Sequence, residues 1–195
     1  MSGGHATRSR RALALSLVFS LLTWAILSSA LAGDDFEFRQ SQIRLEDGIY
    51  YLDATMDSAF SEEALEALNN GVPLTIIIHL QIRRVNAWLW EDSLLDRQMR
   101  YAIRYKPLSE RYEVYRLPGT SGRGFETREA AIRALGELQN VQLIAQDKLD
   151  EEEEYEIQIK VFLDIEELPL PLRPMAYLKP SWKLSSGWSK WPLSP

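Results

Sequence analysis

A long strand with two different faces, predicted over residues 74–84, constrains the fold of this chain more than any other segment. Side chains alternate between the two sides of a strand, so residues two apart share a face. The aliphatic face holds Leu74, Ile76, Ile78, Leu80 and Ile82, and the polar face holds Thr75, His79, Gln81 and Arg83. This pattern predicts a half-buried strand of an antiparallel sheet, because a parallel strand is usually apolar on both faces.

Other strands are predicted before and after this one. Alternating apolar residues mark them at 36–45, 49–56, 95–106, 111–117, 141–146 and 155–165, and the last has the cleanest alternation. Asp47-Gly48 predicts a tight hairpin turn between the first two of these strands. The alternation changes phase within residues 36–45, which predicts a bulge near residues 40–42.

Two short helices are predicted between the strands. Ser61 and Thr127 are suitable amino-terminal caps, because a hydroxyl can accept a hydrogen bond from a free N–H group of the first turn. Asn69-Asn70-Gly71 ends the first helix, and Pro73 keeps it from resuming. About seven strands and two short helices, joined by short turns, predict an α+β domain that is mainly antiparallel, as a sandwich or a curved sheet.

The first 32 residues have the layout of a secretory signal peptide. A basic head precedes the uncharged apolar run Ala12–Leu27, and Ala30-Leu31-Ala32 fits the small-residue cleavage pattern. We expect cleavage after Ala32, with a retained inner-membrane anchor as the alternative, because the run is shorter than the ~20 residues that span a bilayer. The chain contains no cysteine. A signal peptide on a cysteine-free chain favours the bacterial periplasm over secretion as a disulfide-bonded domain.

Residues 33–167 would then form the α+β domain, and residues 168–195 a tail rich in proline and tryptophan. The three prolines in Leu168–Pro174 favour an extended, polyproline-like path and exclude a helix there. The tryptophans of the tail follow, at Trp182, Trp188 and Trp191. Because large aromatic side chains are mostly buried, we expect the tail to pack on the domain, with Trp182 and Leu184 in an added edge strand.

The composition argues against several classes of function. The chain carries 22 basic and 28 acidic residues, and the part after residue 32 is more acidic still, so nucleic acid is not an expected partner. Without cysteine there is no thiol nucleophile and no thiolate metal site. His79 is the one histidine after residue 32, the acidic run 147–154 lacks the spacing of a calcium-binding loop, and no catalytic motif stands out. We predict no catalytic residues, no cofactor and no metal.

Basic and aromatic side chains in the middle of the sequence make up the predicted interaction surface. Its members are Arg83, Arg84, Trp88, Trp90, Arg100 and Arg104. An anionic ligand or an acidic partner would fit such a surface. The alternative for Arg100 and Arg104 is that Glu154 and Glu156, on a neighbouring strand, pair with them and neutralise them. The alternative for the two tryptophans is that at least one of them closes the core.

Five segments taken together carry a resemblance to a known family. They are Leu52-Asp53-Ala54, the run from Leu65 to Leu74, the run from Arg104 to Ser109, Leu163-Asp164 with the run from Leu168 to Leu172, and the run from Trp182 to Trp188. In this order they resemble the DUF4390 family of exported proteobacterial proteins, whose members have been labelled proline-rich signal peptide proteins. The resemblance implies an exported protein of a Gram-negative bacterium and brings no assigned activity.

Three functions are compatible with these observations. The preferred one is a non-enzymatic periplasmic interaction module that has a protein partner in the cell envelope, such as a membrane sensor. The alternative is a carrier of a lipid or another apolar ligand, although residues such as Tyr101 and Ile132 are bulky enough to fill the interior themselves. The third is an envelope hydrolase that uses His79. Contact with the membrane is expected only through a retained amino-terminal segment.

Overall fold

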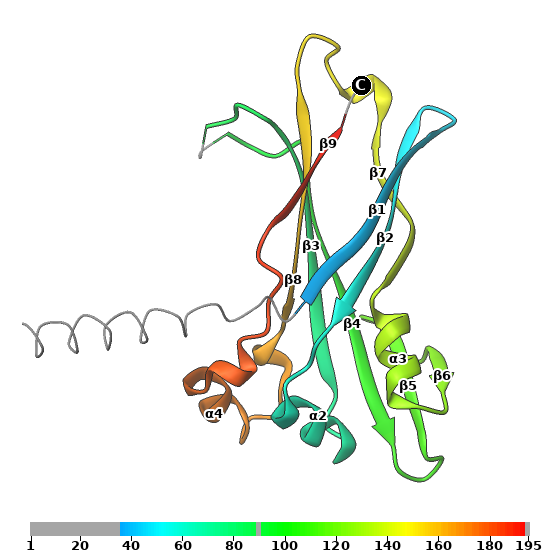
Figure 1. Ribbon diagram of the computed structural model, residues 1–195, viewed down its shortest axis with the longest axis vertical. Coiled ribbons are helices and arrows are strands. Elements are labelled where there is room, and N and C mark those ends of the chain that lie inside the picture. Colours follow the sequence, from blue (N-terminus) through cyan, green and yellow to red (C-terminus); the bar gives the residue numbers. More distant parts are fainter. Residues whose placement is uncertain (1–35, 89–90, 194–195) are drawn as a thin grey trace, which may run out of the picture. The chain divides into compact units, whose positions relative to one another are not determined.

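Two antiparallel sheets make up the part of the chain that the computed structural model describes, residues 36–88 and 91–193 (Figure 1). The smaller sheet has the strand order β1-β2-β7, with β1 at Phe36–Glu46, β2 at Ile49–Ser58 and β7 at Glu137–Ala145. The larger sheet has the order β6-β5-β4-β3-β8-β9. Its strands are β3 (Leu74–Arg84), β4 (Leu95–Lys106), β5 (Arg111–Arg116), β6 (Arg123–Phe125), β8 (Tyr155–Leu163) and β9 (Ser189–Leu193). The predicted signal peptide, residues 1–32, lies outside the described residues.

Strand β3 lies inside the larger sheet, between β4 and β8, and pairs antiparallel with both. The five aliphatic residues of its predicted buried face are all fully buried, so that face is confirmed. The opposite face is only partly in water, because Thr75 and Ile77 are buried there as well. Ile77 pairs with Arg100 of β4 on one side and with Phe162 of β8 on the other. The chain that follows β8 stays close to this end of β3, because the Asp164 N–H donates to the Thr75 carbonyl at 2.7 Å.

The hairpin β1-β2 contains both of the local features that the sequence predicts. Asp47 and Gly48 form its turn with φ angles of 49° and 74°, in the left-handed region that a tight hairpin turn requires. The register shifts between Phe38 and Gln40, which is the predicted bulge. Phe36 and Phe38 pack on the core before the bulge, and Ile43 packs on the core after it. In a regular strand, even- and odd-numbered residues would face opposite sides, so the extra residue of the bulge is what lets all three face the core.

The two predicted helices are α2, at Glu62–Asn69, and α3, at Arg128–Leu135. The Ser61 hydroxyl accepts a hydrogen bond from the Ala64 N–H at 3.3 Å, and Thr127 caps α3 in the same way through Ala130 at 3.2 Å. Each helix buries one stripe, through Ala64 and Leu68 in α2 and through Ala131 and Leu135 in α3. Both helix starts and both caps are therefore confirmed.

The hydrophobic core is built from the inner faces of both sheets and from the two helices, and the α+β class is confirmed. Its largest fully buried side chains are Phe36, Leu52, Leu68, Leu74, Ile76, Ile78, Leu80, Ile82, Ile103, Ile157, Ile159 and Trp182. One polar bridge joins the two sheets beside this core, where Arg97 of β4 donates to the Gln142 carbonyl of β7 at 2.7 Å.

The described residues form nine strands instead of about seven, because the strand pattern of the sequence does not mark β6 and β9. Strand β6 is three residues long, too short to show an alternation. Strand β9 contains Pro192, which an edge strand tolerates because its N–H side can face outward. The edge beside β8 is thus covered by β9, and the strand expected at Trp182 and Leu184 is a short 3₁₀ helix, η3 (Pro180–Trp182), followed by one bridge from Ser185 to Phe162.

The prediction that Leu168–Pro174 excludes a helix is wrong at its end. A third helix, α4, runs over Arg173–Leu178, after a short 3₁₀ turn, η2, at Ile165–Glu167. Pro174 lies in the first turn of α4, where a missing N–H leaves no hydrogen bond unmade and the fixed φ of proline suits a helix.

Candidate functional site

The six residues of the predicted interaction surface do not lie together. Arg83 and Arg84 end β3, whereas Arg100 faces Ile77 in the register, six residues back along that strand. At a rise of about 3.3 Å per residue this separates Arg83 from Arg100 by about 20 Å. Trp88 follows β3 closely and lies with the first pair. Trp90 lies outside the described residues.

Arg100 and Arg104 are neutralised, but by other carboxylates than the sequence predicts. Arg100 donates to Asp164 at 2.9 Å and to Glu167, and Arg104 donates through Nε to Glu113 at 2.9 Å. Glu156 cannot serve them, because β3 separates β4 from β8 and Glu156 faces Arg83 in the register. These two arginines therefore hold the sheet and the chain after β8 in place.

Glu113 is a buried carboxylate whose ionisation should support the fold. Hydrogen bonds from Lys106 lower its pKa below the ordinary value of 4.5, burial opposes this, and bonds from Arg104 and the Gly122 N–H add to the lowering. Because the folded state holds the proton more weakly than the unfolded state, the stabilisation is present above the ordinary pKa. This stabilisation is lost as the pH falls through the lowered pKa that Glu113 has in the folded state.

We expect Glu113→Gln to lower the free energy of unfolding by about 1–3 kcal/mol at about pH 7 and to lose less stability than the wild type on acidification. Urea unfolding followed from about pH 7 to about pH 3 measures both effects. Glu126→Gln is the matched control, since the Glu126 side chain is 87% exposed. If the free energy of unfolding fell equally with decreasing pH in the wild type and in Glu113→Gln, ionised Glu113 would not be stabilising the fold.

Arg83, Arg84, Trp88, Trp188 and Lys190 form a cluster that we call the basic-aromatic corner. Arg83 Nη2 donates to the carbonyls of Trp88 and Glu91, both at 3.0 Å, in the connection that follows β3. The side chains of Trp88 and Trp188 remain 68% and 42% exposed. A hollow of about 320 Å³ lies at this corner, lined by Arg83, Arg84, Val85, Ala87, Glu156, Gln158, Trp188 and Lys190.

The three cations of the corner lie close to the carboxylates of Glu91, Glu153 and Glu156. Lys190 pairs with Glu156 at 2.8 Å, and Arg84 pairs with Glu91 at 3.2 Å. Burial opposes ionisation of Glu156, but hydrogen bonds from Lys190 and Gln158 and the charge of Arg83 lower its pKa below the ordinary value. Glu156 is therefore ionised at neutral pH, and the carboxylates of Glu91, Glu153 and Glu156 balance the three cations of the corner.

His79 supports this corner from the outer face of β3. Its Nε2 is 2.8 Å from Asp96 Oδ1, and Gln81 donates to the other oxygen of Asp96 at 2.6 Å. Burial opposes ionisation of Asp96, while these two bonds lower its pKa below the ordinary value. The His79 ring contacts the Trp188 ring at a centroid distance of 5.1 Å. Within residues 36–88 and 91–193, the described interactions of the His79 ring are with Asp96 and Trp188, so the ring helps to position a tryptophan side chain.

The part of the corner that the sequence does not predict comes from the tail. Trp188 directly precedes β9, and Lys190 lies within it. Both reach the corner because β9 pairs with β8. The local sequence patterns of β8 and β9 do not indicate that these two strands pair. The expectation that Trp88 or Trp90 closes the core fails for Trp88, which is exposed.

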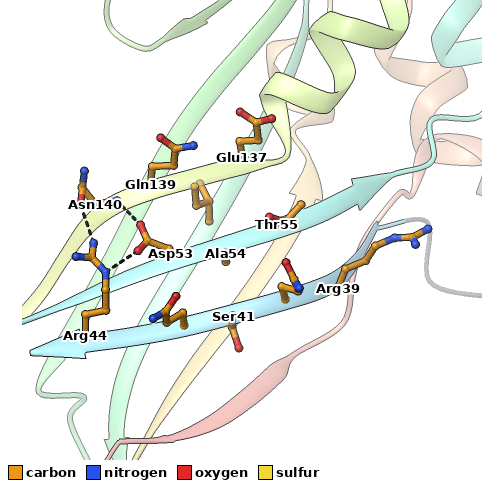
Figure 2. Close-up of a pocket in the computed structure, with 12 residues that line it drawn as sticks. Arg39, Ser41, Arg44, Asp53, Ala54, Thr55, Glu137, Gln139 and Asn140 are labelled. Atoms are coloured by element: carbon orange, nitrogen blue, oxygen red, sulfur yellow. Dashed lines mark hydrogen bonds and ion pairs between the residues drawn. The ribbon is translucent and has the colours of Figure 1, made fainter.

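A larger polar hollow of about 880 Å³ lies on the outer face of the smaller sheet (Figure 2). Asp53 accepts hydrogen bonds from Arg44 Nε at 2.8 Å and from the Asn140 N–H at 2.7 Å, and Arg44 also donates to the Asn140 side chain at 2.7 Å. The bond from Asn140 is the main cause of the lowered pKa of Asp53. The three side chains join β1, β2 and β7 where the register of β2 with β7 shifts, so they brace the sheet and use up their own polar groups.

Comparison with known proteins identifies one family. The family described as Domain of unknown function (DUF4390) matches residues 33–192. Searches of curated proteins and of solved structures found no match. Within the described ranges, no helix is both long and apolar enough to cross a membrane. The match spans well over half of the sequence and agrees with the resemblance seen in its segments, so the chain belongs to the DUF4390 family.

Proposed function

We propose that this protein is an exported, non-enzymatic interaction module that binds a protein of the cell envelope through the basic-aromatic corner. The observation that carries the proposal is the exposure of Trp88 and Trp188 at one corner, beside Arg83 and Arg84. Tryptophan and arginine supply much of the binding energy at protein interfaces, and exposed aromatic patches mark such interfaces. The hydrogen bond from Arg83 to the Trp88 carbonyl ties Trp88 to the end of β3.

The chemistry of the corner favours a partner segment that combines polar or charged groups with an apolar side chain. The charged groups can pair with polar groups of a partner, and the hollow, which Val85 and Trp188 help to line, can take an aliphatic or aromatic group. Export is supported by the layout of residues 1–32 and by the absence of cysteine from the sequence. The periplasm is the proposed location, and a retained inner-membrane anchor would place the corner in the same compartment.

In-cell crosslinking of the tagged full chain, followed by mass spectrometry, tests the proposal. We expect a specific envelope protein to be captured, and we expect Trp88→Ala and Lys190→Glu each to reduce the capture about tenfold. Leu108→Ala is the matched control, because Leu108 is fully exposed in the turn between β4 and β5. Capture that is unchanged by both corner variants, while their unfolding matches that of the wild type, would overturn the proposal.

The other two functions draw less support from the described residues. A carrier of apolar ligands needs an apolar cavity, whereas both hollows described above are lined mainly by polar and charged groups. A hydrolase needs a nucleophile beside His79, and the described partners of that ring are Asp96 and Trp188.

A further inference from the structure

A second exposed apolar surface lies on the segment that leads through α4. Leu170, Met175, Tyr177 and Leu178 are 73%, 38%, 47% and 82% exposed, and we call these four side chains the α4 patch. The prolines at 169, 171, 174 and 180 are exposed beside them. Soluble domains seldom gather several large apolar side chains in one exposed segment unless that segment contacts something.

The α4 patch is held outward by a fixed backbone. Leu168 and Ala176 are buried on the core side of the segment, and Trp182 is buried just after it. Arg173 Nε donates to the Leu168 carbonyl at 2.7 Å, which closes the turn before α4. Because these buried residues anchor the segment, the side chains of the patch cannot turn inward without removing the anchors from the core.

The segment that carries the α4 patch has a charge opposite to that of the whole chain. Residues 168–183 contain Arg173, Lys179 and Lys183 and no acidic residue, in a chain whose net charge is −6. The acids just before this segment are already engaged, since Glu166 accepts from the Tyr177 hydroxyl and Glu167 pairs with Arg100. Exposed leucine, methionine and tyrosine with flanking lysines are typical of segments that lie in a membrane interface.

The patch lies at the end of the domain where the amino-terminal segment joins it. Phe36, the first described residue, packs edge-on against Phe60 at a ring distance of 5.6 Å, and Phe60 directly precedes the cap of α2. Helix α2 contacts η3, and η3 contacts α4, so all three lie at one end of the sheets (Figure 1). The 35 residues that precede Phe36 include the apolar run Ala12–Leu27.

We propose that the α4 patch rests on the anionic surface of a phospholipid membrane. Tyr177, Leu178 and their neighbours would enter the headgroup region, and Lys179 and Lys183 would meet anionic headgroups. A second copy of the chain fits this surface poorly, because a two-fold contact would bring the cations of both copies together without any acid in residues 168–183. The membrane supplies the missing negative charge.

A local probe on the full chain tests this proposal whether or not residues 1–32 are retained. Since the chain has no cysteine, Leu178→Cys introduces one unique thiol, which is labelled with a polarity-sensitive dye. Leu108→Cys, in the turn between β4 and β5, is the matched control. With vesicles of phosphatidylglycerol and phosphatidylethanolamine we expect a blue shift and quenching by a lipid-borne quencher at position 178, and neither at position 108.

The charge requirement is tested by reversing lysines in the labelled chain. Lys179→Glu with Lys183→Glu is expected to raise the vesicle concentration for half-maximal shift at least about tenfold, and exposed Lys148→Glu to leave it unchanged. Three results would overturn the proposal. They are no shift at position 178, a shift that follows protein concentration without vesicles, and a blue-shifted dye in the free chain that reverts when residues 1–32 are removed. None of these variants changes the basic-aromatic corner. Failure of the membrane proposal can therefore be distinguished from failure of the proposed function.

Discussion

Replacing Trp182 with alanine is expected to lower the free energy of unfolding by about 3–5 kcal/mol, a large part of the stability of an ordinary domain. Trp182 is 2% exposed and lies in the core that the two sheets share with the chain after β8. Truncation to alanine removes the buried area of the largest residue in that core and leaves a cavity that the surrounding strands can fill only in part. Urea unfolding at neutral pH measures the loss.

Two further tryptophan variants test whether the loss of stability comes from the burial of Trp182 or from the removal of any tryptophan side chain. Trp88→Ala, at a side chain that is 68% exposed, should change stability by less than about 1 kcal/mol. Trp182→Phe should cost less than Trp182→Ala, because it keeps most of the buried ring and removes an indole N–H that has no hydrogen-bond partner among the described residues. Equal losses for Trp182→Ala and Trp88→Ala would contradict the position of Trp182 in the core.

Gly136→Ala is expected to destabilise the protein by about 3 kcal/mol, although alanine is normally well tolerated at the end of a helix. Gly136 follows α3 with a φ of −82°, so alanine causes no backbone strain there. The cost is steric. A Cβ at this position would overlap the carbonyl oxygen of Met56, and the Gly136 carbonyl already accepts the Met56 N–H at 2.9 Å, so the two backbones cannot separate freely.

Gly124→Ala is the matched control for this prediction. A Cβ at Gly124 would have its nearest described neighbour, Arg111 Nε, at 3.8 Å, which is an ordinary contact. We expect this variant to remain within about 0.5 kcal/mol of the wild type in the same urea titration. A Gly136→Ala protein as stable as Gly124→Ala would show that β2 and the end of α3 are not in contact.

Local chemistry made much of the fold predictable from the sequence. The alternation in residues 74–84 and 155–165, the hydroxyl caps at Ser61 and Thr127, and the Asp47-Gly48 turn each act within a few residues. The bulge in β1 was also visible, because a strand that changes phase while keeping one face on the core must contain an extra residue. Such signals specify elements without saying which elements become neighbours.

The candidate site was less predictable because it depends on the order of strands in the larger sheet. Arg100 and Arg104 looked available until the register gave them Asp164 and Glu113 as partners. Trp188 joined the basic-aromatic corner only through the pairing of β9 with β8, more than 100 residues from Arg83 in sequence. Pairing of that kind is set by the whole core and leaves no mark in a window of ten residues.

The position of β9 also determines when the protein can fold. Among the described residues it is the last segment to be synthesised, yet Leu193 and Trp182 lie in the same core as Phe36. The core of the described part is therefore complete only after β9 has been synthesised. Folding of the described part thus requires contacts between segments that are far apart in the sequence, which slows folding in general.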